Sequence, residues 1–256
     1  MSASYKYKLK PSLSETFRGI IWKIETDDSN TIVAVETRDV SERITYFSAF
    51  DYTSGKCLFK EITVEEGWFW SLDRVVDGMV FLHSYVNESN PEHKGIIAID
   101  KAGDMAWQQY HKTLHDVTDK GILVYNPKIQ PKLLELISPA TGDLISAPAA
   151  PSFSVTRNIL LPEILEETSS IKHLLPESII GPAFYLSFGD KEILVFHTDK
   201  EKKICQQLVV YQHGNIVLED ILAEDIQKLN PEAFFIQNSH LFYIRNNKQE
   251  FVSYLV

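Results

Sequence analysis

The sequence predicts an all-β protein, folded as a single closed β-propeller of five blades. Three observations lead to this prediction: a unit of four short strands recurs, glycine turns recur at matching places within it, and aromatic residues make up 11% of the 256 residues. Aromatic residues favour strands. A four-stranded repeat of about 40 residues has the size of one propeller blade.

The clearest unit spans residues 67–111. The extended segment WSLDRVV reaches a turn at Asp77-Gly78, and the apolar segment MVFLHSYV follows. A polar loop, NESNPEHK, then leads to GIIAID, the tight turn KAGD and the closing segment MAWQQY. These are four short strands separated by three turns, the layout of one blade.

The preceding unit, residues 19–63, repeats this layout. Trp22 matches Trp70 and Gly55 matches Gly103, and the members of each pair stand 48 residues apart. Two landmarks that share one period predict equivalent positions in successive blades.

Three further units complete the predicted ring, with glycine turns at Gly142 and Gly214. They cover residues 112–147, 183–222 and 232–256. The last unit lacks a fourth strand, and residues 4–10, SYKYKLK, are predicted to supply it. That pairing would close the ring and remove exposed strand edges.

Residues 147–182 interrupt the repeat. The segment is rich in proline, and the spacing in LLPEILEETSSIKHLLPES favours short helices, one of them beginning at Pro162. We interpret it as a partly helical insertion between the third and fourth blades. The alternative is a sixth, eroded blade.

Composition restricts the partners. The formal net charge is −10, so no basic field is present to attract nucleic acid. The N-terminus lacks the apolar stretch of a signal peptide, and no segment approaches the length of a membrane span. Two distant cysteines make no disulfide framework. We therefore expect a cytoplasmic protein that binds neither nucleic acid nor membrane.

The unit at 67–111 resembles the repeat of quinoprotein-like (PQQ-type) propellers. The matching residues are Asp77-Gly78, Ala98-Ile99-Asp100, Gly103 and Trp107, and the match weakens after residue 112. The whole chain looks like a small uncharacterised bacterial family, a resemblance that implies a fold but no activity. Quinone-dependent dehydrogenases are larger and exported, and they carry a metal-binding carboxylate set, so no cofactor is predicted.

Candidate ligand-binding residues lie where the five middle strands end. Polar side chains that meet at one mouth of a propeller would form a surface for a ligand or partner, and two arginines could hold a carboxylate or phosphate. The plainer interpretation is that buried strands meet solvent at these positions. The residues are Arg38, Tyr85, Asn126, His197 and Arg245.

Aromatic and histidine side chains add three candidates. Trp68 and Trp70 are two residues apart, so in a strand they would face the same side and could line a cleft. For Trp70 the favoured interpretation is that it fills the space between blades, because large aromatic side chains dominate cores. His115 stands near His111 and Asp116, which are metal-ligand types, but the segment is predicted as a loop without a further ligand in register. We therefore predict no metal site.

The predicted function is a non-catalytic binding propeller that presents one face to a protein or small ligand. The alternative is a carbohydrate-active hydrolase or lyase with two carboxylates in the central funnel. Nothing in the spacing selects such a pair, and no phosphate loop or nucleophile motif is present. The carboxylates considered for it are Asp73, Glu88, Asp116 and Asp199.

Overall fold

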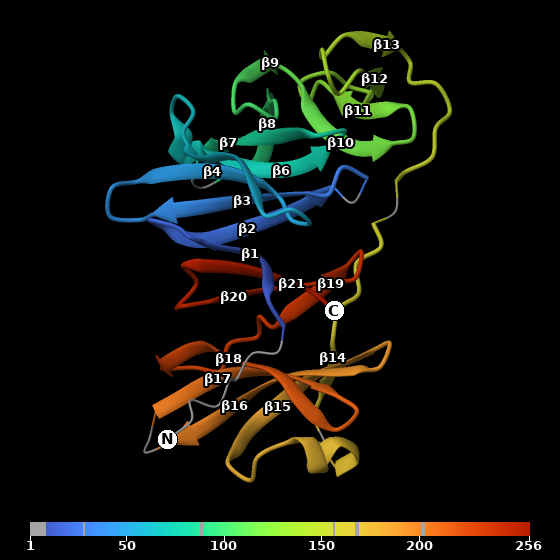
Figure 1. Cartoon of the computed structure of the whole chain (residues 1–256). Helices are drawn as coiled ribbons and strands as arrows, with labels where there is room; N and C mark the ends of the chain where they lie inside the picture. The colour runs from blue at the N-terminus through green and yellow to red at the C-terminus, as the bar shows by residue number, and fades with distance from the viewer. Residues whose placement is uncertain (1–8, 28, 88–89, 156, 167–168, 201–202) are drawn as a thin grey trace. The chain divides into compact units, whose positions relative to one another are not determined.

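The structure is a computed structural model that describes residues 9–27, 29–87, 90–155, 157–166, 169–200 and 203–256. These residues form mainly strands, which are arranged in five antiparallel sheets (Figure 1). The all-β prediction is therefore confirmed. The chain divides into two compact units: unit 1 is Met1–Thr16 with Asn158–Val256, and unit 2 is Phe17–Arg157. The prediction of a single domain stays a prediction.

Unit 2 holds three four-stranded sheets, each built from consecutive strands. The first contains β2 (Ile20–Asp27), β3 (Ile32–Asp39), β4 (Ile44–Asp51) and β5 (Lys56–Ile62). After the 3-10 helix η1 (Gly67–Phe69), the second contains β6 (Trp70–Val76), β7 (Met79–Asn87), β8 (Asn90–Ile99) and β9 (Met105–Gln109). The third contains β10 (Thr113–Thr118), β11 (Gly121–Tyr125), β12 (Glu135–Ile137) and β13 (Leu144–Ser146).

Unit 1 holds the other two sheets. One contains β14 (Glu163–Leu165), β15 (Ile179–Phe188), β16 (Lys191–Lys200), β17 (Lys203–Gln212) and β18 (Asn215–Ile226), with the 3-10 helix η2 (Ser169–Leu174) between β14 and β15. The other contains β19 (Phe234–Gln237), β20 (His240–Arg245) and β21 (Glu250–Leu255), and its fourth strand is β1 (Pro11–Thr16).

Within each unit the sheets pack through apolar side chains, as near-continuous apolar strands predict. In unit 2, Leu72 and Leu82 lie in one buried cluster with residues of the first sheet. Phe81 lies in another with Ile122 and Val124 of the third sheet. The second sheet is therefore covered on both faces, and any polar side chain inside it sits among apolar layers.

Each of the four predicted glycine turns joins the last two strands of its sheet, and each glycine has a positive φ. Two of them pack closely against the preceding sheet. A Cβ on Gly103 would lie 2.9 Å from Phe59 Cβ, and one on Gly142 would lie 2.8 Å from the Trp107 ring. Only glycine combines this backbone conformation with such an approach.

Three details of the sequence prediction need correction. Trp22 and Trp70 are not equivalent: Trp22 lies within β2 and is 63% exposed, whereas Trp70 begins β6 and is 5% exposed. The segment after Pro162 is strand β14, because Glu163 to Leu165 pair with the long strand β15. That segment thus extends the fourth sheet, and among the described residues of 147–182 only η2 is helical.

The N-terminal strand that joins the last sheet is also displaced. It is β1, Pro11–Thr16, and Ser14 pairs with Val252. Of the predicted segment, residues 4–8 lie outside the described residues, and Leu9 and Lys10 precede the strand. Alternating serines fit an edge strand whose outer face meets solvent.

Candidate functional site

The first strand of each of the three sheets in unit 2 carries a β-bulge. The pairing shifts by one residue at Trp22 in β2, at Asp73 in β6 and at His115 in β10. A bulge bends its strand and changes the direction of nearby side chains, and bulges often stand beside functional sites. The repeat therefore places a redirected side chain on each of these three strands.

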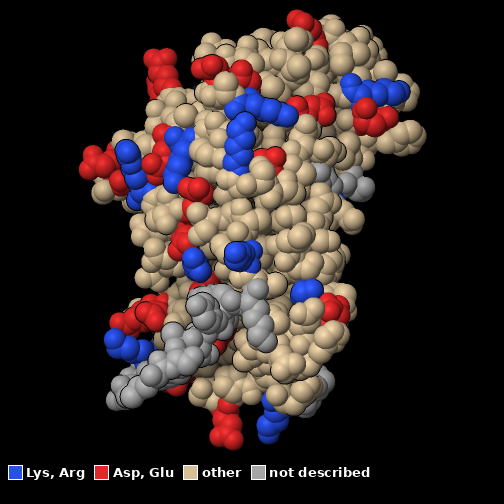
Figure 2. Space-filling view, in the orientation of Figure 1, with Lys and Arg blue, Asp and Glu red and all other residues tan. Residues whose placement is uncertain are grey.

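The carboxyl ends of the same strands border a pocket of 620 Å³. This size suits a small ligand. Its lining is rich in charged side chains of both signs: three are basic (Arg74, Lys120 and Arg157) and four are acidic (Asp27, Asp77, Asp116 and Asp119). Figure 2 likewise shows basic and acidic side chains interspersed over the visible face.

Glu25 organises the basic side of this pocket. Its carboxylate is buried and forms ion pairs with Arg157, with Lys23 at 3.3 Å and with Arg74 at 3.8 Å. One buried carboxylate thus holds three cations in place. Because three positive charges share this one carboxylate, its single negative charge does not neutralise them, and they can still attract the polar groups of a ligand.

Asp116 stands on the acidic side. Its carboxylate accepts hydrogen bonds from the Ser154 hydroxyl and from the Val117 amide, the latter at 2.8 Å. Burial acts to raise the pKa of Asp116, but these hydrogen bonds outweigh it and leave the pKa lowered. Asp116 is therefore an ionised acceptor near neutral pH.

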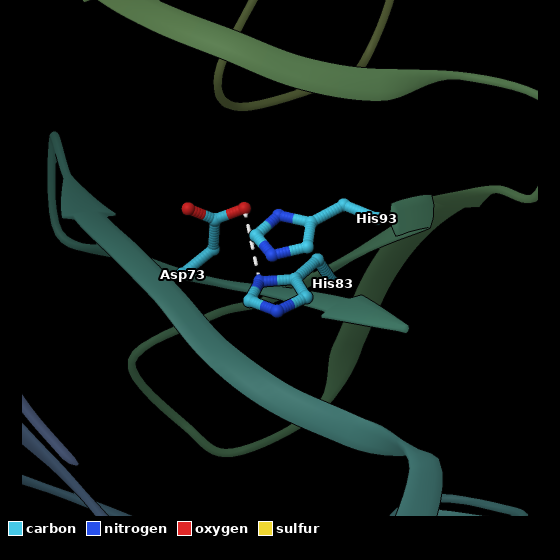
Figure 3. Close-up of side chains that lie close together, drawn as sticks. All are labelled: Asp73, His83 and His93. Atoms are coloured by element: carbon cyan, nitrogen blue, oxygen red, sulfur yellow. Dashed lines mark ion pairs between the residues drawn. The ribbon is translucent and has the colours of Figure 1, made fainter. Parts of the chain in front are cut away.

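Beside the pocket, Asp73, His83 and His93 converge from the neighbouring strands β6, β7 and β8 (Figure 3). Asp73 Oδ2 lies 3.2 Å from His83 Nδ1, and the two imidazoles stack with ring centroids 3.5 Å apart. The other carboxylate oxygen of Asp73, Oδ1, lies 3.3 Å from Arg74 Nη1. Arg74 therefore connects this cluster to the pocket.

The environment sets the charge of two members of the cluster. Burial acts to raise the pKa of Asp73, but the contact with His83 and the nearby Arg74 and Lys23 outweigh it, so the pKa is lowered. Burial, followed by the neighbouring His83, lowers the pKa of His93. Asp73 is thus a carboxylate and His93 a neutral imidazole at neutral pH.

Of the predicted site residues, Arg38 and Trp68 meet. The Arg38 guanidinium lies 5.3 Å from the Trp68 ring and 5.0 Å from the Trp22 ring, and it pairs with Glu36 at 2.7 Å. Trp70 is buried in the core, and Trp68 belongs to η1. The expectation that Trp68 and Trp70 share one face of a strand is therefore wrong, because the 3-10 turn breaks the alternation.

Tyr85, His115 and Asn126 occupy separate parts of unit 2. Tyr85 packs edge-on against His83 and His93, at 5.0 and 5.4 Å between ring centroids, and so borders the cluster. His115 is exposed on β10, with Nδ1 3.2 Å from Lys132 Nζ. Asn126 lines a second pocket with His111.

The remaining two residues belong to unit 1. His197 is buried, and its Nε2 accepts a hydrogen bond from the Asn230 amide at 3.0 Å. Arg245 is held by Asp220 and Glu250. Those carboxylates raise the pKa of Arg245, Glu250 contributing most. Both side chains thus have structural partners within their own unit.

The sequence interpretation missed His83 and His93 and considered Asp73 only as a general carboxylate. One available signal was the histidine inside the apolar segment MVFLHSYV, because burying a polar side chain is unfavourable unless it has a partner. A second was the equal spacing of ten residues between successive members. His93 was predicted to lie in a loop, but in the structure it belongs to strand β8.

Comparison with known proteins gives limited matches. Residues 26–107, which include Asp73, His83 and His93, match a family model described as a domain of unknown function (DUF4905). No curated protein matches. Within the described residues, no helix is long and apolar enough to cross a membrane.

Solved structures resemble the chain at low identity. Raptor from Chaetomium thermophilum is 9% identical with a TM-score of 0.39, and the match covers 96% of this chain and 28% of that one. A eukaryotic initiation factor is 11% identical with a TM-score of 0.33, covering 94% and 53%. A GH43_1 enzyme from Xanthomonas citri is 10% identical with a TM-score of 0.33, covering 96% and 90%. The chain thus spans about a quarter of the first protein and half of the second.

Proposed function

We propose that this chain is a five-bladed β-propeller that acts as a binding module, and that its pocket in unit 2 takes a small polar molecule. Support for the propeller comes from the five antiparallel sheets, the repeated glycine turns and the pairing of β1 with β21. Support for binding comes from the pocket at the ends of β2, β6 and β10.

The observation that carries the proposal is the mixed charge of the pocket lining. Arg74 and Arg157 are held by Glu25, and Asp116 is held by Ser154 and Val117. Donors and acceptors fixed before a ligand arrives lose little entropy on binding. A ligand that both donates and accepts hydrogen bonds, such as a sugar, a sugar acid or an amino acid, fits this lining.

Two carboxylates, Asp116 in the pocket lining and Asp73 beside it, favour binding over glycoside hydrolysis. A glycosidase needs one carboxylic acid that stays protonated near neutral pH, which requires a raised pKa. Asp73 and Asp116 instead have lowered pKa values. Of the other carboxylates considered, Asp199 lies in unit 1 and Glu88 lies outside the described residues.

The test is a binding screen of sugars, sugar acids and amino acids, followed by isothermal titration of any compound that binds. Lys120→Ala and Asp77→Asn remove charges from the pocket lining without emptying the core, since both residues are exposed. We expect either variant to weaken binding by about tenfold, equivalent to one hydrogen bond to a charged group.

Matched controls are Lys128→Ala and Asp143→Asn, which remove the same kinds of charge from unit 2 outside this pocket. They should leave the affinity unchanged. The proposal fails if no compound of these classes binds, or if the pocket variants and the controls bind a ligand equally well.

A further inference from the structure

The register of the second sheet, which has two irregularities, brings Asp73, His83 and His93 together. In β6, Asp73 is the extra residue between the pairs Leu72–Leu82 and Arg74–Phe81. In β8, Gly95 is the extra residue between the partners of His83 and Ser84, and its φ is +68°. Ser71 pairs with His83, so Asp73, two residues further along β6, lies on the same side of the sheet as His83. The extra residue Gly95 brings His93, which pairs with Tyr85, to that face as well.

The three residues supply the donor set of a transition-metal site. One ligand atom from each lies within 4.8 Å of the others. Two imidazoles and a carboxylate suit zinc and related divalent ions, whereas calcium and magnesium prefer oxygen ligands alone. Three protein ligands also leave a fourth position open for water or a ligand.

His83 provides an independent observation that points to a ligand. It is 2% exposed, and neither ring nitrogen has a hydrogen-bond partner among the described residues. Nδ1 approaches Asp73 Oδ2, but not along a direction that makes a hydrogen bond. Buried polar nitrogens normally have a hydrogen-bond partner, because a buried nitrogen without one loses its hydration and gains nothing in return. A bound metal ion would satisfy a His83 nitrogen.

The charges around the cluster are compatible with a cation. The two carboxylate oxygens of Asp73 have different neighbours: Oδ1 lies near Arg74 and Oδ2 lies near His83. Lys23 Nζ reaches the Asp73 carbonyl oxygen at 3.5 Å. Glu25 pairs with both cations, which reduces their repulsion of a metal ion.

Metal binding requires one local movement. The imidazole planes are within 10° of parallel, so their nitrogen lone pairs do not meet. Zinc–nitrogen bonds of about 2.0–2.1 Å place two tetrahedral ligands about 3.4 Å apart with converging lone pairs. His93 is less buried than His83, and its hydrogen bond to β10 is made by its backbone carbonyl, which accepts from Thr113 Oγ1. The imidazole of His93 can therefore rotate about its side-chain bonds without breaking that hydrogen bond.

From this geometry we propose that Asp73, His83 and His93 bind a divalent transition-metal ion. Zinc(II) is held by one carboxylate oxygen and two imidazole nitrogens, and His93 leaves its stack on His83 as it coordinates. The site is separate from the polar-ligand proposal, because none of its three residues lines the pocket.

The experiment is titration of the chelator-treated full chain with Zn²⁺ alone, with Co²⁺ absorption as a second readout. We expect one Zn²⁺ per chain and a tetrahedral Co²⁺ spectrum. His93→Gln should weaken Zn²⁺ binding by more than about 100-fold, since even outer partners of metal ligands are worth 10–100-fold. His83→Gln should do the same, and the more exposed His93 variant remains informative if the His83 variant does not fold.

His115→Gln, an exposed histidine of the same unit, is the matched control and should retain Zn²⁺ binding and the Co²⁺ spectrum. Ca²⁺ and Mg²⁺ should not compete. The proposal is overturned if Zn²⁺ binds no more tightly than about 1 mM, if His93→Gln and His83→Gln bind it like the wild type, or if His115→Gln alone abolishes binding.

Discussion

Two buried histidines, one in each unit, occupy the second strand of a hairpin yet have different surroundings. His197 in β16 is 1% exposed, and its Nε2 accepts from Asn230. His83 in β7 is 2% exposed, and both its nitrogens lack a hydrogen-bond partner within the described residues. Burial is the same in both cases, so burial alone does not indicate a site.

The neighbours make the difference. Around His197, Gln206 and Asn230 hydrogen-bond to each other, and Gln206 also donates to the carbonyl of Glu232 at 2.6 Å. This network fixes the segment between β18 and β19. Around His83, the neighbours are a carboxylate and a second imidazole, which are metal-ligand types. One histidine stabilises a loop, and we propose that the other binds an ion.

The largest expected effect is on stability in unit 1. His197→Ala should lower the free energy of unfolding by about 2–4 kcal/mol, since it empties a buried volume and leaves the Asn230 amide without its acceptor. Urea unfolding measures this loss. His197→Gln can return an acceptor near the same place and should recover about 1 kcal/mol. Equal losses in the two variants would contradict the role assigned to this hydrogen bond.

The stabilisation of the fold by a metal ion should depend on His83 and not on His197. At 100 times its Kd, Zn²⁺ should raise the free energy of unfolding by about 2.7 kcal/mol. His197→Gln should keep this increment, and His83→Gln should lose it. Denaturant unfolding with and without Zn²⁺ measures both. If the increment disappeared in the His197 variant, the histidines would not differ as described.

Gly95→Ala tests the bulge that directs His93. An alanine there would adopt a positive φ and would place its Cβ 3.2 Å from the Trp70 ring. We expect a loss of about 1–2 kcal/mol from the backbone conformation. We also expect weaker Zn²⁺ binding, because the strand must shift beside His93. Gly189→Ala is the control, with φ +60° but open space around the Cβ, and it should share the stability loss without affecting Zn²⁺.

The smallest effect is a pH dependence of the metal-free protein. Burial lowers the pKa of His197, so the unfolded state binds a proton that the folded state does not. The stabilisation is complete above the unfolded pKa of about 6.5 and is lost as pH falls toward the lowered folded pKa, by at most about 1.4 kcal/mol per pH unit. Unfolding between pH 7 and 5 measures the slope. A steeper slope in His197→Gln than in the wild type would show the sign to be wrong.

The repeat could be predicted from the sequence because local chemistry determines it. Gly103 and Gly142 sit where a positive φ and a close packing contact exclude other residues, and such positions are visible as turn glycines. The apolar middle strands could be recognised because they are buried on both faces. These features depend on a few adjacent residues.

The candidate site could not be predicted in the same way. It depends on strand register, and a shift of one residue sends a side chain to the opposite face. His93 shares a face with His83 only because β8 contains the extra residue Gly95. The predicted equivalence of Trp22 and Trp70 is wrong for a related reason, because a shared spacing in sequence does not fix strand register. Trp22 is the extra residue of a bulge and is exposed, whereas Trp70 is buried.

The pairing of β1 with β21 has a consequence for the order of folding during synthesis. Ser12 Oγ donates to the Ser253 carbonyl oxygen across 241 residues of sequence. Unit 2 is continuous and built from successive hairpins, so it can fold while the ribosome is still translating Asn158–Val256 of unit 1. In the last sheet β21 lies between β1 and β20, so these two strands have no partner at that position until β21 has been synthesised. Unpaired strand edges promote aggregation, so we expect the partly made chain to be most prone to aggregate during this interval.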